Sequence, residues 1–235
     1  MTDSFGKCFL FLFVLLPFLT PSQSVINDPV ATEIRNAIPT DHFDDDEQLL
    51  QLEFLQEQWI ANCFQSFFSA SMEKELHRAS KGLSKPDRTK LPLHVATFLK
   101  DLDAVWITLK MSEGTWYPVI DYVRYGPMMK DISPWLKKYI QIVKRETELP
   151  CTEDAGITIS WQEMAERLVN CESFLHQYPS VMKAEQIRNL ELFYLRIITM
   201  GTDNSPVTMS FSSSSFQTDL LDAYRSIASR HDSPW

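Results

Sequence analysis

The spacing of apolar residues between positions 160 and 204 predicts two amphipathic helices. In the first helix, apolar side chains recur every three or four positions, which puts them on one side. They are Trp161, Met164, Ala165, Leu168, Cys171, Phe174, Leu175 and Tyr178. The apolar stripe of the second helix comprises Ala184, Ile187, Leu190, Phe193, Tyr194, Ile197 and Ile198. Because only a few residues connect the two helices, we expect them to pack antiparallel, each covering the apolar face of the other.

Residues with known effects on helix ends bound both predicted helices. Ser160 and Glu163 have the spacing of a capping box, in which the hydroxyl and the carboxylate accept hydrogen bonds from amides that the first turn leaves unpaired. Pro179 ends the first helix, since it has no amide donor and pushes Tyr178 toward extended geometry. Gly201 is the expected stop of the second helix.

The same periodicity extends over most of the remaining chain. It predicts further helices at about 45–79, 92–110, 134–145 and 216–229. Glycine is scarce, at 6 residues, and alternating strand-like runs are few, so we expect an all-α fold in which a helical bundle is followed by antiparallel helix pairs of a repeat-like type. The expected segments are a signal peptide at 1–24, a polar lead-in at 25–46, the N-terminal helical bundle at 47–146, a linker at 147–159 and the helical-hairpin region at 160–235.

The end of the first helix has a weaker copy near the C-terminus. A shift of about 53 positions aligns Leu168 with Leu221 and Ser173 with Ser226, together with several similar pairs. Two unrelated amphipathic helices match about as well by chance, because both repeat their apolar positions with the helix period. The pattern therefore leaves a true repeat and an accidental match both open.

The sequence motifs of the helix pair resemble a known family. The run FLHQYPS at 174–180, followed by a helix with LELFYL at 190–195, is similar to the tetratricopeptide-like (TPR-like) helical repeats of bacterial envelope proteins. The resemblance covers about residues 160–204, with a fainter echo at 216–234. It implies stacked helix pairs with a concave surface that binds a protein partner, and it carries over no catalytic residues.

The first 24 residues have the pattern of a secretory signal. Lys7 supplies a positive charge, an apolar run extends from Cys8 to Leu19, and Ser22 and Ser24 are small residues at the spacing of a cleavage site before Val25. The apolar run is shorter than the roughly 20 residues that span a bilayer as a helix. We therefore expect a secreted or periplasmic protein; the alternative is a protein anchored in the membrane by an uncleaved N-terminal segment.

Charge and hydropathy narrow the classes of partner. The formal net charge of -9 argues against unaided binding to nucleic acid, which requires a clustered positive field. No second apolar run approaches membrane length, so we expect no stable membrane span after signal cleavage. A protein partner is the remaining expectation.

The expected mature chain has three cysteines, an odd number for an oxidising compartment. Cys63 and Cys171 lie on apolar helical stripes, where cysteine acts as a small buried hydrophobic residue. Cys151 lies beside Pro150 in a loop, and Cys171 is its nearest candidate for a disulfide. This bridge is one possibility beside three free thiols, because sequence does not establish the geometry that a disulfide requires.

Motifs that would identify an enzyme or a cofactor are missing from the sequence. It contains no GxSxG elbow, phosphate-binding glycine loop, HExxH motif or pair of cysteines at zinc spacing, and its five histidines are scattered. We therefore expect no cofactor, no metal site and no catalytic residues that sequence can identify. The acidic run at 42–47 has negative charge suited to the start of the next helix, and the aromatic segment at 116–125 is expected to pack between helices.

These observations favour an exported, non-enzymatic α-helical protein that acts as a protein-interaction scaffold. The alternative is an exported hydrolase or small-ligand-binding protein with a site formed only in the fold, for which the carboxylates at 44–47 and the aromatic segment at 116–125 are the best candidates. A pocket with convergent polar groups would favour that alternative.

Overall fold

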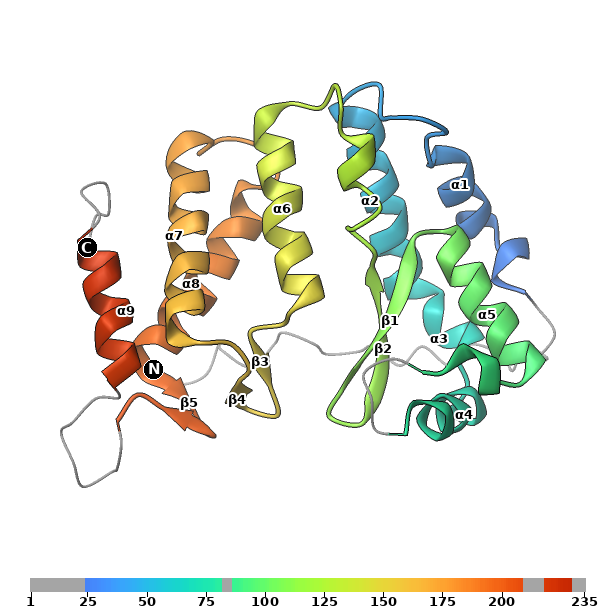
Figure 1. The fold of residues 1–235 in the computed structure, drawn as a ribbon. Coiled ribbons are helices and arrows are strands. Elements are labelled where there is room, and N and C mark those ends of the chain that lie inside the picture. The colour runs from blue at the N-terminus through green and yellow to red at the C-terminus, as the bar shows by residue number, and fades with distance from the viewer. Residues whose placement is uncertain (1–23, 82–85, 209–217, 230–235) are drawn as a thin grey trace, which may run out of the picture.

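The computed structural model describes residues 24–81, 86–208 and 218–229, and this part of the chain is largely helical (Figure 1). Its α-helices are α1 (Pro29–Ala37), α2 (Asp46–Asn62), α3 (Phe64–Phe67), α4 (Ala70–Ser80), α5 (Leu93–Ala104), α6 (Pro134–Glu148), α7 (Trp161–Gln177), α8 (Ala184–Met200) and α9 (Thr218–Ala228). Three short antiparallel hairpins join some of them: β1 (Ile107–Ser112) with β2 (Thr115–Ile120), β3 (Thr152–Glu153) with β4 (Gly156–Ile157), and β5 (Gly201–Thr202) with β6 (Ser205–Pro206). The expected α-helical class is thus confirmed in outline, while the hairpins were not expected. Residues 1–23 of the expected signal peptide at 1–24 lie outside the described residues, as do residues 210–215, which are rich in serine.

The helix predicted at 45–79 is wrong as one continuous element. The structure divides it into α2, α3 and α4, with extended backbone at Phe68 and a new N-cap at Ser69, whose side chain accepts a hydrogen bond from the amide of Met72. The break lets Phe68 pack against two other rings. Its ring centroid lies 5.0 Å from that of Phe64 and 5.9 Å from that of Phe98 on α5. A straight helix would point part of this wide apolar stripe into water.

The helix predicted at 92–110 is also wrong in its second half. Helix α5 ends at Ala104, and β1 begins at Ile107. The buried side chain of Gln56 on α2 donates a hydrogen bond to the Val105 carbonyl oxygen at 2.8 Å, so this carbonyl has a partner outside any helix. The residues that follow alternate in the manner of a strand, and the two-residue turn Glu113–Gly114 has positive φ at both positions, which is the type I′ geometry of tight hairpins.

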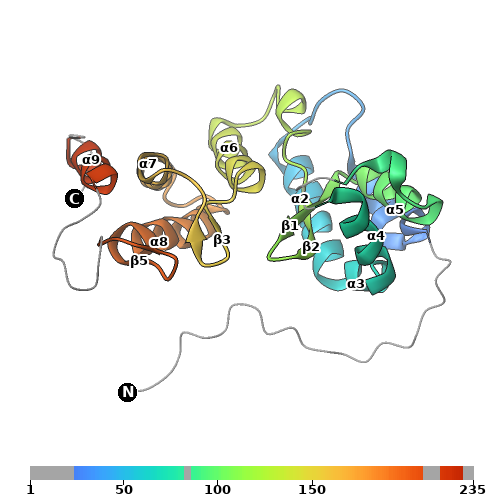
Figure 2. The ribbon, with the colours of Figure 1, turned by 60° about the horizontal axis from the view of Figure 1, so that its bottom comes forward.

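The helix pair predicted between residues 160 and 204 is confirmed. Helices α7 and α8 pack against each other, and α9 packs on α7 (Figure 2). The Ser160 hydroxyl accepts a hydrogen bond from the Glu163 amide at 3.1 Å, as a capping box requires, but the Glu163 carboxylate binds Arg145 and Arg167 instead of completing the box. Phe193, expected in the apolar stripe, is 41% exposed, because the partner helix covers a narrower face than the spacing suggested.

Two of the hairpins contact each other at their tips. The amide of Asn204 donates a hydrogen bond to the carbonyl oxygen of Ala155 at 3.0 Å, and the amide of Ile157 donates one to the Ser205 hydroxyl at 3.0 Å. The segment expected as a linker at 147–159 therefore contains an ordered hairpin. Whether it also separates two domains stays a prediction.

Buried apolar side chains form one connected cluster that runs from Val25 to Ile227. Within the described ranges, no helix is long and apolar enough to cross a membrane.

Candidate functional site

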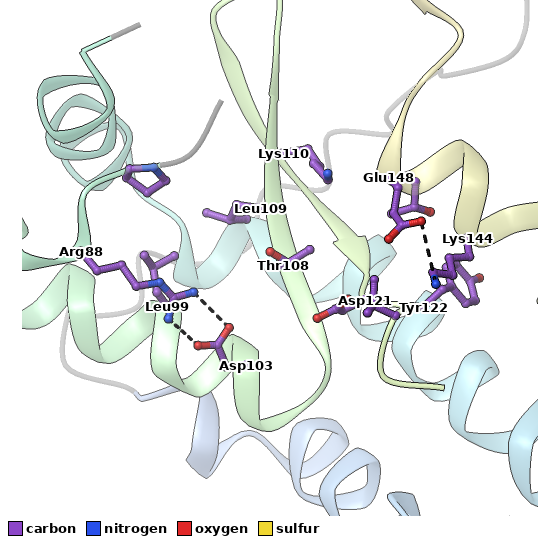
Figure 3. Close-up of a pocket in the computed structure, with 13 residues that line it drawn as sticks. Arg88, Leu99, Asp103, Thr108, Leu109, Lys110, Asp121, Tyr122, Lys144 and Glu148 are labelled. Carbon is purple, nitrogen blue, oxygen red and sulfur yellow. Dashed lines mark hydrogen bonds and ion pairs between the residues drawn. The ribbon is translucent and has the colours of Figure 1, made fainter. Parts of the chain in front are cut away.

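A cleft of about 680 Å³ lies beside strand β1, between helix α5 and the last turns of helix α6 (Figure 3). Three consecutive residues of β1, Thr108, Leu109 and Lys110, line it. Successive side chains of a strand point to opposite faces, so a cavity that meets all three follows the edge of the strand. The cleft is formed by segments that lie far apart in sequence: the residues before α5, the β1–β2 hairpin and α6.

The wall on the α5 side combines apolar surface with one closed ion pair. Arg88, from a 3-10 turn before α5, donates two hydrogen bonds to the Asp103 carboxylate, at 2.5 and 3.1 Å. The bonds to Asp103 raise the pKa of Arg88 above its usual range. Leu99 and Leu109 supply the apolar part of this wall. Because the guanidinium and the carboxylate satisfy each other, this wall has no unpaired charge to attract a charged ligand, and its two leucines are only 4% and 9% exposed.

The wall on the α6 side is richer in accessible charge. Lys144 lies 4.0 Å from Glu148, one turn further along the helix, which is the outer limit of an ion pair. Lys110 extends from β1 toward this wall, and no described residue forms a hydrogen bond or ion pair with its ammonium group. A second hollow of about 400 Å³ shares Lys144 and Glu148 with the cleft and adds Lys138 and Arg145. On this side of the cleft, Lys110 is therefore the group that is available to bind a negatively charged ligand.

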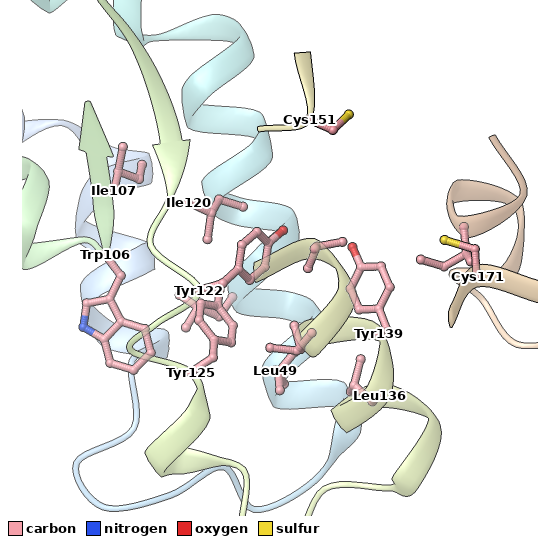
Figure 4. Close-up of a cluster of buried hydrophobic side chains, with 14 of the residues drawn as sticks. Leu49, Trp106, Ile107, Ile120, Tyr122, Tyr125, Leu136, Tyr139, Cys151 and Cys171 are labelled. Atoms are coloured by element: carbon pink, nitrogen blue, oxygen red, sulfur yellow. The ribbon is translucent and has the colours of Figure 1, made fainter. Parts of the chain in front are cut away.

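The floor of the cleft leads into a buried polar network on helix α2. Tyr122 lines the cleft and donates its hydroxyl hydrogen to Oε1 of Glu53 at 2.7 Å. Tyr139 of α6 donates to the same oxygen at 2.7 Å, and the Lys183 ammonium lies 2.7 Å from the other oxygen of Glu53. Burial, followed by the charge of Glu53, raises the pKa of Tyr122 well above its usual range, so the phenol stays a donor. Tyr122, Tyr125 and Tyr139 are among the buried side chains drawn in Figure 4.

Most acidic side chains at the cleft are already bound to a basic residue. The described residues that line the cleft include no histidine, cysteine or serine. Asp103 is bound to Arg88, and Asp121 is bound to Arg124 at 3.1 Å. In the described part of the chain, no three histidine, cysteine or acidic side chains are grouped so as to hold a metal ion.

The acidic run at 42–47 has structural contacts away from the cleft. Asp45 caps α2 by accepting the amide of Gln48 at 2.9 Å, which confirms that this charge serves the helix start. Asp46 accepts a hydrogen bond from the amide of Ser133 at 2.8 Å and thereby connects α2 to the start of α6. Phe43 is fully buried, with its ring 5.6 Å from that of Tyr125.

The aromatic segment at 116–125 packs in the interior, as expected. Tyr125 lies 5.4 Å from both Trp106 and Tyr122, measured between ring centroids. Of this segment, only Asp121, Tyr122 and Val123 line the cleft. None of the carboxylates at 44–47 lines the cleft, so the two groups of residues proposed for an alternative ligand site do not meet there.

Cys151 and Cys171 are both buried, and both are free thiols in the structure. Burial raises the pKa of Cys151 to about 12, with a smaller contribution from the negative charge of Glu146. The same two causes raise the pKa of Cys171. Neither thiol is an activated nucleophile, since a raised pKa keeps it protonated. The disulfide between them stays a prediction.

Sequence reasoning missed the residues that form the cleft. Arg88, Asp103, Lys110 and Lys144 belong to no motif and are spread over more than 50 positions. The available signal was the alternation from Ile107 to Ser112 before the Glu-Gly turn, which indicates a hairpin.

Comparisons with protein-family models, curated proteins and solved structures give no match.

Proposed function

We propose that this protein is a non-enzymatic, helical protein-interaction scaffold that binds a segment of another polypeptide in the cleft beside β1. The observation that carries the proposal is the cleft itself, which follows the edge of a strand and has one wall with a closed ion pair and one wall with a lysine that no described residue pairs with. Its volume of about 680 Å³ accommodates several residues of a peptide. We propose further that the protein works in a secreted or periplasmic location.

The helical framework supports this proposal because it holds the cleft walls in place. Gln56 of α2 anchors the start of the β1–β2 hairpin, and Tyr122 and Tyr139 attach the hairpin and α6 to the same carboxylate, Glu53. A site whose walls are already ordered loses less conformational entropy when its partner binds. We also propose that residues 160–204 form helical repeats of the TPR-like type.

A small anionic ligand is the competing occupant, and the observation that favours it is the ammonium of Lys110, which has no partner among the described residues. The cleft volume fits such a ligand as well as a peptide. The two kinds of ligand differ in the part of the cleft that they would contact. A peptide would contact the cleft along the length of β1, whereas a small anion would contact only the wall on the α6 side.

The test is selection of a random peptide library, displayed on phage, against the purified protein. Selected peptides should bind the variant Thr108→Trp at least tenfold more weakly, because the indole fills the cleft. Thr115→Trp is the matched control, since Thr115 is exposed on β2 and does not line the cleft. Peptides that bind both variants and the wild type equally, or a selection that enriches none, would contradict the proposal.

A further inference from the structure

The β1–β2 hairpin has two edges, and its register determines which backbone groups point outward. In a type I′ hairpin the residues that flank the turn, here Ser112 and Thr115, form a hydrogen-bonded pair, and such pairs then alternate with non-hydrogen-bonded ones. The alternation predicts a hydrogen-bonded pair at Trp106 and Asp121, and the Asp121 amide does donate to the Trp106 carbonyl oxygen at 2.8 Å. Leu109 and Met111 therefore direct their amide and carbonyl groups away from β2.

The outer edge of β2 is closed to another strand. The amide of Trp116 donates a hydrogen bond to the Glu73 carboxylate of α4 at 3.2 Å. Pro118 stands at the next outward position and has no amide hydrogen. Proline and side-chain contacts of this kind are the usual means by which an exposed strand edge is protected.

The outer edge of β1 has no such protection. Outside the hairpin, no described residue forms a hydrogen bond with the backbone of Leu109 or Met111. This open edge is the one along which the cleft runs, since Thr108, Leu109 and Lys110 all line it and no residue of β2 does. An open edge in a cleft is the geometry in which a partner adds a strand to a sheet.

The two faces of β1 differ in what they offer to side chains of an added strand. Leu109 points toward Leu99 and the closed pair of Arg88 with Asp103, whereas Lys110 points toward Lys144 and Glu148 (Figure 3). Side chains of an added strand alternate between these faces. One set would meet the closed Arg88–Asp103 pair and the small exposed parts of Leu99 and Leu109, where an uncharged side chain fits best. The other set would meet the ammonium of Lys110, which has no partner among the described residues.

From these contacts we infer that the cleft binds an extended peptide segment by adding it as a strand to the edge of β1, and that the segment alternates apolar with acidic residues. The backbone of the segment bonds the outward groups of Leu109 and Met111. Its acidic side chains lie on the Lys110 face, and its apolar side chains lie on the Leu109 face. This inference rests on the proposed function and states how the partner is recognised.

The test uses a defined probe, the acetylated and amidated peptide Val-Glu-Val-Glu-Val-Glu-Val, with binding to the purified protein measured by fluorescence anisotropy. Two further peptides carry N-methyl groups on all valines or on all glutamates. Because an added strand directs only every second amide toward its partner, one N-methylated peptide should lose at least tenfold in affinity and the other should bind nearly as well as the parent. Loss with methylated valines indicates an antiparallel strand, and loss with methylated glutamates indicates a parallel one.

The side-chain preference is tested by charge reversal at Lys110. Lys110→Glu should weaken binding of the glutamate peptide by roughly tenfold and improve binding of the corresponding lysine peptide, since it replaces an attraction by a repulsion. Lys100→Glu makes the same change on the exposed side of α5, outside the cleft, and should leave both affinities nearly unchanged.

The outcomes separate this inference from the proposed function. If peptides selected from the library depend on the cleft while both N-methylated peptides bind as the parent does, strand addition is wrong and the binding function stands. If polyanions such as heparin bind at the cleft as tightly as the peptide and with the same dependence on Lys110, the cleft recognises charge alone and the inference is overturned. If no peptide binds at all, both proposals fail.

Discussion

Tyr122 connects the surface of the cleft to the protein interior, because its hydroxyl donates a hydrogen bond to the fully buried carboxylate of Glu53 across 2.7 Å. Glu53 accepts a second hydrogen bond, from the phenol of Tyr139 on α6, and Lys183 at the start of α8 neutralises its charge. One carboxylate thus joins four parts of the chain: α2, the segment after β2, α6 and α8. Stability and the shape of the cleft should therefore depend on the same buried group.

Removing the cation of this network should destabilise the protein strongly. Lys183→Met leaves the Glu53 charge buried with only two phenols, which should lower the free energy of unfolding by about 3 kcal/mol. Lys100→Met, at an exposed lysine of α5, should change it by less than about 0.5 kcal/mol. Urea denaturation measures both values.

A double-mutant cycle distinguishes the ion pair from simple loss of packing. Combining Lys183→Met with Glu53→Gln should recover at least about 1 kcal/mol relative to the sum of the single changes, because no uncompensated charge remains. Strictly additive effects would mean that Lys183 stabilises the fold through its alkyl chain.

Acid should weaken the contact between α6 and α7 through Glu163. Burial alone would raise the pKa of this carboxyl, but hydrogen bonds from Arg167 and Arg145 outweigh it and hold the pKa below the usual 4.5. A carboxyl with a lowered pKa in the folded state stabilises the protein above its unfolded-state pKa, and this stabilisation is lost as the pH falls through the folded-state value. The melting temperature of the wild type should therefore fall on acidification below about pH 4.5.

The variant Glu163→Gln isolates this contribution. It should be less stable than the wild type at pH 7 by roughly 2 kcal/mol, because the buried guanidinium of Arg167 loses one of its anionic partners. The difference between the two proteins should shrink as the pH is lowered toward 3. A difference that is constant with pH would show that the carboxylate is not the titrating group.

Gly201 should be irreplaceable, whereas Gly126 should tolerate a side chain. Gly201 has φ +73, and a Cβ atom there would lie 2.6 Å from the carbonyl oxygen of Ser205, so Gly201→Ala should cost about 2 to 3 kcal/mol. A Cβ atom at Gly126 would have no neighbour within 4 Å, so Gly126→Ala should be close to neutral. Thermal unfolding of the two variants compares them directly, and equal melting temperatures would contradict the geometry of the β5–β6 turn.

Cleavage before Val25 should change the partner of a buried carboxylate. Asp101 of α5 is 3% exposed and accepts a hydrogen bond from the Ser24 hydroxyl at 2.5 Å. Removal of Ser24 would leave this carboxylate beside the new α-amino group of Val25, and we expect the two to form an ion pair. N-terminal sequencing of exported protein tests the cleavage site.

The ion pair itself is tested with Asp101→Asn. This change should destabilise protein that begins at Val25 more than protein that retains Ser24, since only the first loses a charge pair. Equal losses of melting temperature in the two forms would show that the amino group does not reach Asp101.

The helices between 160 and 204 were predictable because neighbouring residues determine them. The apolar spacing, the cap at Ser160 and the stop at Gly201 act within a few positions, and α7 and α8 begin and end where those residues indicate. The helix predicted at 92–110 failed for the opposite reason. Its apolar residues fit helical spacing, but Gln56, about 50 positions earlier, binds the Val105 carbonyl, and the chain continues as a strand.

The sequence by itself thus determined a largely helical chain and the ends of its best-marked helices, since periodicity and capping are local properties of the backbone. Only the tertiary structure decided where α5 ends and β1 begins, the burial of Glu53 with its phenols and the cleft beside β1. Arg88, Lys110 and Lys144 come together there because helix and strand packing brings distant segments into contact. No spacing along the chain records that proximity, which depends on how α5, β1 and α6 pack against one another.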